Sequence, residues 1–184
     1  MDANNLQNWN RTTEAIYKNV MLLSIAGICA SLFGMIPLMG WLAKVCNFCV
    51  VAGYVAFYLR INDLKLMVDQ NDADNMKKLS LGILLYILGI VLKEIPVAGW
   101  ILGPIAFIVS FVFMLLAYNG LKKSTTFPGK EGMRLLFIAM IIGLVAGVFA
   151  LIPLVGTIIA GILGIVEFVL ILLGWKKVAE PIAC

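Results

Sequence analysis

The sequence predicts an all-α membrane protein with six transmembrane helices, arranged as three repeated antiparallel helical hairpins with tight I-P-x-x-G turns. Three observations predict this fold: an apolar composition, six apolar runs, and one short phrase that recurs. The 184 residues are 62% hydrophobic and 13% charged, with a mean hydropathy of +1.04. A soluble domain is nearer one-half apolar and one-quarter charged. This chain has too little polar surface to cover a water-exposed globule, so the excess must face lipid.

Six apolar runs have about the 17–25 residues that a helix needs to cross a bilayer. In lipid the backbone must satisfy its own hydrogen bonds, so each run should be a helix. The runs are Val20–Ile36, Trp41–Leu59, Leu79–Ile95, Trp100–Tyr118, Leu135–Ile152 and Thr157–Gly174.

The recurring phrase connects the runs in pairs. It reads MIPLMGW from Met35, EIPVAGW from Glu94 and LIPLVGT from Leu151. Proline disfavours helix in the residue before it, and glycine can take a positive φ that reverses the chain. So short a turn makes the two flanking helices antiparallel neighbours. The predicted turn residues are Pro37, Gly40, Pro96, Gly99, Pro153 and Gly156.

The spacing of the phrase indicates an internal repeat within one membrane domain, 1–184. The three prolines are 59 and 57 residues apart, which is typical of a duplicated unit. The predicted hairpin repeats cover about 18–60, 77–121 and 133–177. The segment 1–17 has apolar residues at helical spacing, and we expect it to be a short interfacial helix that leads into the first span.

The basic residues predict the orientation. Twelve of the 14 lysines and arginines flank the termini and the two polar connectors, and only Lys44 and Lys93 lie towards the hairpin turns. The positive-inside rule then places both termini and both polar loops in the cytoplasm. The short loops favour a bacterial inner membrane. An aromatic belt would place Trp9 and Trp175 at one membrane surface, with the two remaining tryptophans at the other.

Glu167 is the sharpest functional candidate, because it lies near the middle of the last run. A carboxylate there costs about 2.5–3.5 kcal/mol on insertion scales. Gly156, Ala160 and Glu167 share one helix face, and small residues mark helix contacts, so Glu167 should face protein or a cavity. It is either a proton or cation site, or a protonated acid that forms a structural hydrogen bond to a neighbouring helix.

The other intramembrane polar candidates are weaker. Ser110 occupies the position of its repeat that Glu167 occupies in the last one, and Tyr86, Tyr54 and Asn47 could line a pathway beside it. Lys44 lies one turn into its span and is expected to anchor at the interface by extending its amine outward.

Cysteine chemistry is a minor alternative. Cys46 and Cys49 form a C-x-x-C on one helix face, as in membrane thiol oxidoreductases. The sequence supplies no second, loop-borne pair, so small apolar packing is the default interpretation. Histidine is absent, and no nucleotide-binding, hydrolase or metalloprotease motif is present. We therefore expect no enzyme, no cofactor and no metal site.

The sequence favours a small polytopic membrane protein that acts as an accessory, scaffold or immunity-type subunit and binds a partner within the membrane. Besides lipid, the expected partners are a membrane protein or a second copy, through small-residue faces such as Ala139/Gly143/Gly147. Nucleic acid is not expected, because topology explains the basic residues. The alternative is a small transporter or oligomeric channel that uses Glu167 for proton or cation coupling. A continuous polar cavity that reaches Glu167 would favour this alternative, and a dry, packed bundle would oppose it.

Overall fold

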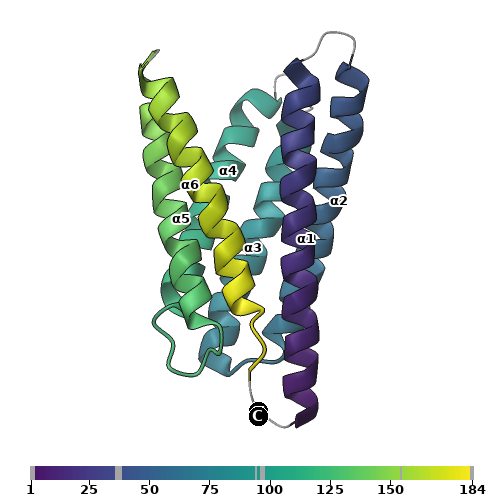
Figure 1. The fold of residues 1–184 in the computed structure, drawn as a ribbon, viewed down its shortest axis with the longest axis vertical. Coiled ribbons are helices and arrows are strands. Elements are labelled where there is room, and N and C mark those ends of the chain that lie inside the picture. Colours follow the sequence, from purple (N-terminus) through teal and green to yellow (C-terminus); the bar gives the residue numbers. More distant parts are fainter. Residues whose placement is uncertain (1–2, 36–38, 94, 96–97, 154, 183–184) are drawn as a thin grey trace.

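A computed structural model describes residues 3–35, 39–93, 95, 98–153 and 155–182, and throughout these ranges the regular structure is helical (Figure 1). Consecutive helices run in alternate directions, so the loops and the termini gather at one end of the bundle and the tight turns at the other. We call these the loop end and the turn end. The helices are α1 (Ala3–Met35), α2 (Gly40–Lys65), α3 (Gln70–Lys93), α4 (Ala98–Leu121), α5 (Lys130–Phe149) and α6 (Val155–Val178).

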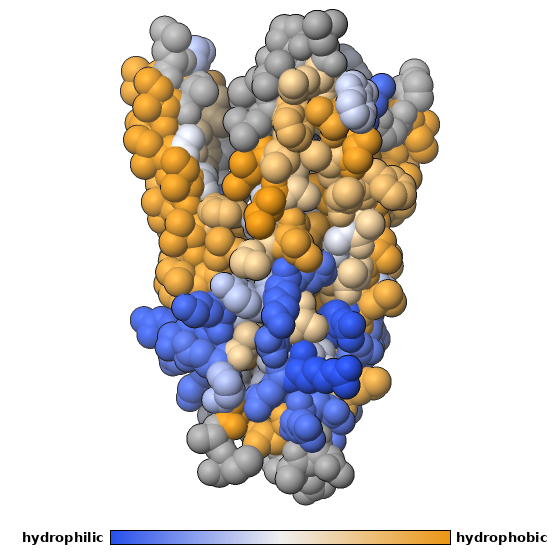
Figure 2. Space-filling model, turned by 45° about the vertical axis from the view of Figure 1, so that its right-hand side comes forward, coloured by the Kyte–Doolittle hydropathy of each residue, from blue (hydrophilic) through white to orange (hydrophobic). Residues whose placement is uncertain are grey.

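Five of these helices are long and apolar enough to cross a membrane, which indicates an integral membrane protein. They are α2 to α6. Helix α1 is not among the five, so the sixth predicted span, Val20–Ile36, stays a prediction. Hydrophilic residues gather at the loop end, and hydrophobic residues cover most of the visible remainder (Figure 2).

The helices pack most extensively in consecutive pairs: α1 with α2, α3 with α4, and α5 with α6. Smaller contacts join α2 to α3, α4 to α5 and α1 to α6, so the six helices close into a ring. Three side-chain hydrogen bonds link the first four helices in series. They run from Asn19 Nδ2 to the Gly53 carbonyl (2.9 Å), from Ser80 Oγ to Asn62 Oδ1 (3.0 Å), and from Ser110 Oγ to the Gly82 carbonyl (2.7 Å).

The first polar connector, predicted as a cytoplasmic loop between the runs that end at Leu59 and begin at Leu79, is mostly helical. Helix α2 continues to Lys65 and α3 begins at Gln70, so the link between them is short. The acidic stretch of this connector resembles a solvated turn in the sequence, but from Gln70 onward it belongs to α3, and Asp72 within it is only 2% exposed. Its Oδ2 accepts hydrogen bonds from the hydroxyls of Ser124 and Thr126, both at 2.8 Å. This contact ties the start of α3 to the α4–α5 loop.

The turn glycines act differently from the prediction. Gly99 and Gly156 lie within the first turns of α4 and α6, and neither has φ in the left-handed region. A Cβ at Gly99 would collide with the Leu92 carbonyl oxygen, and one at Gly156 with the Phe149 carbonyl oxygen. Close backbone approach, rather than a positive φ, therefore requires glycine at both sites. Gly40 begins α2, and Pro153 is exposed between α5 and α6, whereas Pro37 and Pro96 lie outside the described residues.

The hydrophobic core is concentrated at the loop end. The segment 1–17, expected to be a short interfacial helix that leads into the first span, is helical from Ala3 and continues without a break into the rest of α1. Its Trp9 packs edge-to-face on Phe127, with ring centroids 5.4 Å apart. Trp9 and Trp175, expected in an aromatic belt, are 0% and 2% exposed, because protein covers them. The main core cluster comprises Trp9, Ile16, Val20, Phe57, Ile61, Leu64, Met76, Leu79, Ile83, Ala117, Tyr118, Leu121, Phe127, Met133, Leu136, Trp175 and Val178.

Candidate functional site

The inside of the ring is hollow above this core. A cavity of about 950 Å³ is lined by side chains from all six helices, which places it near the upper end of the roughly 300–1,000 Å³ typical of ligand sites. Most of the lining is apolar, with a few hydroxyls and one carboxyl group, Glu167.

Aromatic side chains form the floor of the cavity at the loop end. Phe57 of α2 meets Trp175 of α6 edge-to-face, with ring centroids 5.2 Å apart. Tyr118 of α4 and Leu136 of α5 also line the floor, and both are buried. The buried core lies directly beneath these residues, so the cavity is closed towards the loops and termini.

The cavity continues to the turn end. Its lining includes Gly147, Val148 and Leu151, and the last of these is 83% exposed. Towards this end the α5–α6 pair leans away from the other helices (Figure 1). Side-chain hydrogen bonds connect α1, α2, α3 and α4 in series, and among the described residues no side-chain hydrogen bond joins these four helices to α5 or α6. The cavity therefore opens at the turn end, beside the α5–α6 pair, which lacks such hydrogen bonds to the other helices among the described residues.

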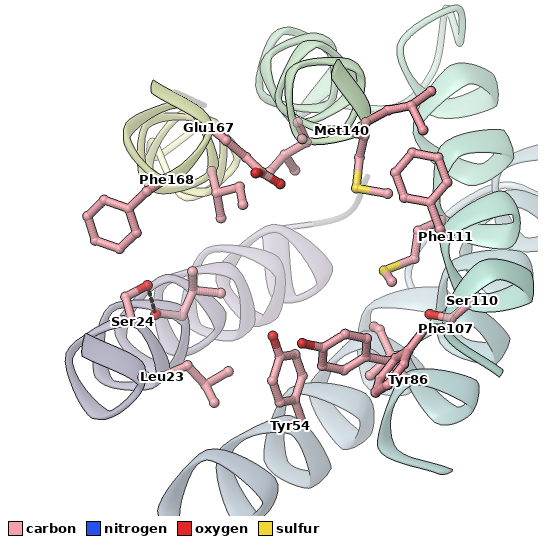
Figure 3. A pocket seen from close by; sticks show the side chains of 18 of the residues that line it. Leu23, Ser24, Tyr54, Tyr86, Phe107, Ser110, Phe111, Met140, Glu167 and Phe168 are labelled. Atoms are coloured by element: carbon pink, nitrogen blue, oxygen red, sulfur yellow. Dashed lines mark hydrogen bonds between the residues drawn. The ribbon is translucent and has the colours of Figure 1, made fainter. Parts of the chain in front are cut away.

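Glu167 points from α6 into the cavity, close to α5 (Figure 3). A Cβ built on Gly143 of α5 would lie under 3.0 Å from the carboxyl carbon and both carboxyl oxygens of Glu167. The carboxyl group thus occupies the space that glycine leaves. As the small-residue stripe predicted, Glu167 lies on the inner side of its helix, with its side chain half-buried.

Aromatic rings from α2, α3 and α4 face Glu167 across the cavity (Figure 3). The rings of Tyr54 and Tyr86 lie 4.7 Å apart between centroids, and Tyr86 lies 5.3 Å from Phe107. Both tyrosine hydroxyls are directed into the open space. Phe111 of α4 adds a further ring to the lining.

The two serines among the described lining residues donate their hydroxyl hydrogen bonds to backbone carbonyl oxygens of helices. Ser24 Oγ donates to the Val20 carbonyl oxygen at 2.8 Å, within α1. Ser110, fully buried, donates to the Gly82 carbonyl oxygen of α3. Ser110 therefore joins two helices. The carboxyl group of Glu167 and the hydroxyls of Tyr54 and Tyr86 are the polar groups best placed to meet a ligand.

No lysine or arginine is among the described residues that line the cavity. The ion pairs found in the described ranges join Lys18 to Glu14, Arg60 to Asp63 and Lys177 to Glu180, all on exposed side chains near the loop end. Glu167 is in none of them. The cavity thus presents an acidic group without a basic partner from its own lining.

The remaining predicted candidates lie elsewhere. Lys44, Asn47 and Cys49 are exposed on α2, and Cys46 is partly exposed; none of the four lines the cavity. Both thiols are free. In the part of the chain that the structure describes, no group of three or more histidine, cysteine, aspartate or glutamate side chains could hold a metal ion. Of the five intramembrane polar candidates, the structure brings together Glu167, Ser110 and Tyr86.

Sequence reasoning missed the aromatic wall and the role of one glycine. Phe107, Phe111 and Phe168 were read only as apolar residues of their spans, although the structure places them on the cavity. Periodicity could not have found them, because α4 and α6 are apolar all round. Gly143 belongs to the small-residue face Ala139/Gly143/Gly147 that the sequence indicates, but its specific contact with Glu167 depends on how α5 and α6 pack together.

Comparisons with known proteins add no assignment: no protein-family model, curated protein or solved structure matches the chain.

Proposed function

We propose that this protein is a small-molecule transporter of the membrane, with the central cavity as its substrate site and Glu167 as the polar anchor. The observation that carries the proposal is the position of Glu167, which points into a large cavity beside Gly143 and finds no lysine or arginine among the described lining residues. A carboxyl group within a span is costly, and a purely structural one would be expected to reach a hydrogen-bond donor. A transported substrate or proton provides a reason to keep it.

In the proposed transport cycle, this structure is the conformation whose cavity opens to the outside of the cell. The loop end holds most of the basic residues and the closed core, and the positive-inside rule assigns that end to the cytoplasm. The cavity would then open to the opposite side, in a bacterial inner membrane with both termini inside. Thr125, exposed in the α4–α5 loop, tests this orientation. In a cysteine-free background, Thr125→Cys should react with an impermeant thiol reagent only from the cytoplasmic side, and labelling of intact cells from outside would reverse the topology.

The proposal includes a repeat of three hairpins. The three extensive consecutive pairs agree with it, as does the recurrence of the I-P-x-x-G phrase at each pair's turn. The α5–α6 unit differs from the other two in carrying Glu167 and in leaning outward, so we propose that it is the element that moves when the cavity changes sides.

Alternating access can be tested without knowing the substrate. Met140 lines the cavity, whereas its neighbour Ile141 is exposed on the outside of the bundle. In the cysteine-free background, Met140→Cys should react with an impermeant thiol reagent from the turn side, and more slowly from the loop side in inside-out vesicles. Ile141→Cys is the matched control and should resist both, because a thiol in lipid does not ionise.

The outcomes of the labelling separate the functions. Labelling of Met140→Cys from the turn side alone would contradict transport and leave a binding protein. Labelling from neither side would mean that the cavity is filled. That result would favour the accessory interpretation, in which a membrane partner or a second copy inserts apolar side chains between α5–α6 and the other helices. The mainly apolar lining is the observation that keeps this second function open.

A further inference from the structure

The chemistry of the cavity points to its ligand class: we propose that it binds a lipophilic organic cation, whose charged centre pairs with Glu167 and whose apolar body lies against the aromatic wall. This inference rests on the proposed function and specifies its substrate.

Charge complementarity carries the first step. The cavity contains one carboxyl group, and no lysine or arginine is present among its described lining residues. A cation that enters this apolar space gains an ion pair that water does not compete for, whereas an anion of the same size meets only like charge or a neutral acid. The site therefore selects by sign of charge.

The aromatic wall carries the second step. Tyr54, Tyr86 and Phe107 form a continuous row of rings, with successive centroids 4.7 and 5.3 Å apart. Aromatic faces attract cations within about 6 Å, most strongly when both groups are desolvated. A quaternary ammonium or phosphonium centre suits this wall better than a metal ion, because it needs no set of oxygen ligands. The large, mainly apolar volume provides room for its hydrophobic substituents.

A proton exchange follows from the same geometry. If Glu167 is neutral in the empty cavity, the cation displaces the carboxyl proton, which leaves to water, so one proton is released for each cation bound. Among the described lining residues, the other titratable groups are Tyr54 of α2, Tyr86 of α3 and Tyr118 of α4; those of α1 and α5 contribute none, and those of α6 contribute only Glu167. Acidification should therefore weaken binding through Glu167.

The experiment compares two ions of matched shape and opposite charge. Radiolabelled tetraphenylphosphonium and tetraphenylborate are measured by equilibrium binding to the full chain in nanodiscs, against empty nanodiscs. Phosphatidylglycerol discs are used first, because this lipid carries no amine that could compete. We expect saturable binding of tetraphenylphosphonium alone, weaker at low pH. Competition on addition of phosphatidylethanolamine would identify a lipid headgroup as the source of the cation.

Two variants test the two parts of the site. Glu167→Gln keeps the size and hydrogen-bonding capacity but removes the charge, and it should lower the affinity for tetraphenylphosphonium about 10- to 100-fold, the scale of a charged hydrogen bond. Its affinity should also become independent of pH. Gly27→Phe fills the cavity, because Gly27 lines it and a Cβ there meets nothing within 4 Å. Gly161→Phe is the matched control, since Gly161 has equal free space but is exposed outside the cavity.

The outcomes distinguish failure of the organic-cation inference from failure of the proposed transporter function. Equal binding of both ions, with loss of both in Gly27→Phe but not in Gly161→Phe, would overturn the cation inference and leave a ligand cavity. Unchanged phosphonium affinity and pH dependence in Glu167→Gln would overturn the role of Glu167. Absence of saturable binding of either ion would overturn the inference, and the labelling of Met140→Cys would then show whether the transporter proposal fails with it.

Discussion

Replacing Gly132 with alanine should open the closed end of the bundle. Gly132 of α5 faces Gly174 of α6, and a Cβ at Gly132 would lie 2.9 Å from the backbone nitrogen of Val178 and closer still to the Gly174 carbonyl oxygen. Because ordinary carbon contacts lie at about 3.5–4.0 Å, α6 would have to retreat by about 0.5–1 Å. These two obstacles are backbone atoms. A third, the Cγ2 methyl of Val178, can turn aside, but no rotation of a side chain can relieve the overlap with the other two.

The expected loss of folding stability in Gly132→Ala is the sum of two opposing contributions. Overpacking destabilises by about 1–3 kcal/mol, and rigid backbone obstacles place this site at the upper end of that range. Alanine recovers about 1 kcal/mol of helix propensity, so the net loss should be about 2 kcal/mol. Gly161→Ala, with nothing within 4 Å of its Cβ, should instead match or exceed the wild type.

Thermal unfolding of the purified variants in one detergent measures this difference. Gly174→Ala should fall between the other two, because its nearest obstacles, at 2.8 and 3.0 Å, are side-chain atoms of Leu136 that can turn aside. A Gly132→Ala protein that melts at or above Gly161→Ala would refute the close approach of α5 and α6 at this site.

Two further predictions concern the site and the loop end. Gly143→Ala should displace the Glu167 carboxyl, the mobile end of a side chain, and so weaken tetraphenylphosphonium binding while changing the melting temperature little. Gly161→Ala, at an exposed position outside the cavity where a Cβ meets nothing within 4 Å, should leave the affinity unchanged, and equal affinities of the two variants would contradict the contact. Asp72→Ala should lower stability by about 2–4 kcal/mol, because it removes two hydrogen bonds to a buried acid, whereas Asp74→Ala, at an exposed position, should stay within about 0.5 kcal/mol of wild type in the same denaturation assay.

The helices could be predicted from the sequence, but their ends could not. Apolar runs of bilayer length specify helices because lipid offers the backbone no alternative partner. Polar residues at the ends of α2 and α3 carry no such constraint, and the buried contact of Asp72 with Ser124 and Thr126 joins positions far apart in the chain. Hydropathy therefore predicts a loop at the end of α2 and the start of α3, whereas tertiary contacts stabilise a helix there.

The inner position of Glu167 could be predicted, but the cavity around it could not. The stripe of Gly156, Ala160 and Glu167 indicates one helix face, which is a local property. The volume in front of that face depends on how far α5 and α6 lean from the other helices, which no periodicity encodes. The turn glycines show the same limit. Their recurrence marked the turns, but only the structure shows that the Leu92 and Phe149 carbonyls exclude a side chain there.

The uneven core would make the surrounding lipid part of the proposed binding site. Side-chain packing holds the helices together at the loop end, whereas at the turn end the α5–α6 pair has acyl chains on its outer side and the cavity on its inner side. The width of the opening there depends on two opposing forces on the α5–α6 pair: the lateral pressure of one leaflet from outside and the contents of the cavity from inside. Mismatch between a helix and its bilayer costs only fractions of a kcal/mol per Å, so a change in leaflet thickness or fluidity can shift this balance. The affinity of the proposed site would thus be a joint property of the chain and the membrane that surrounds it.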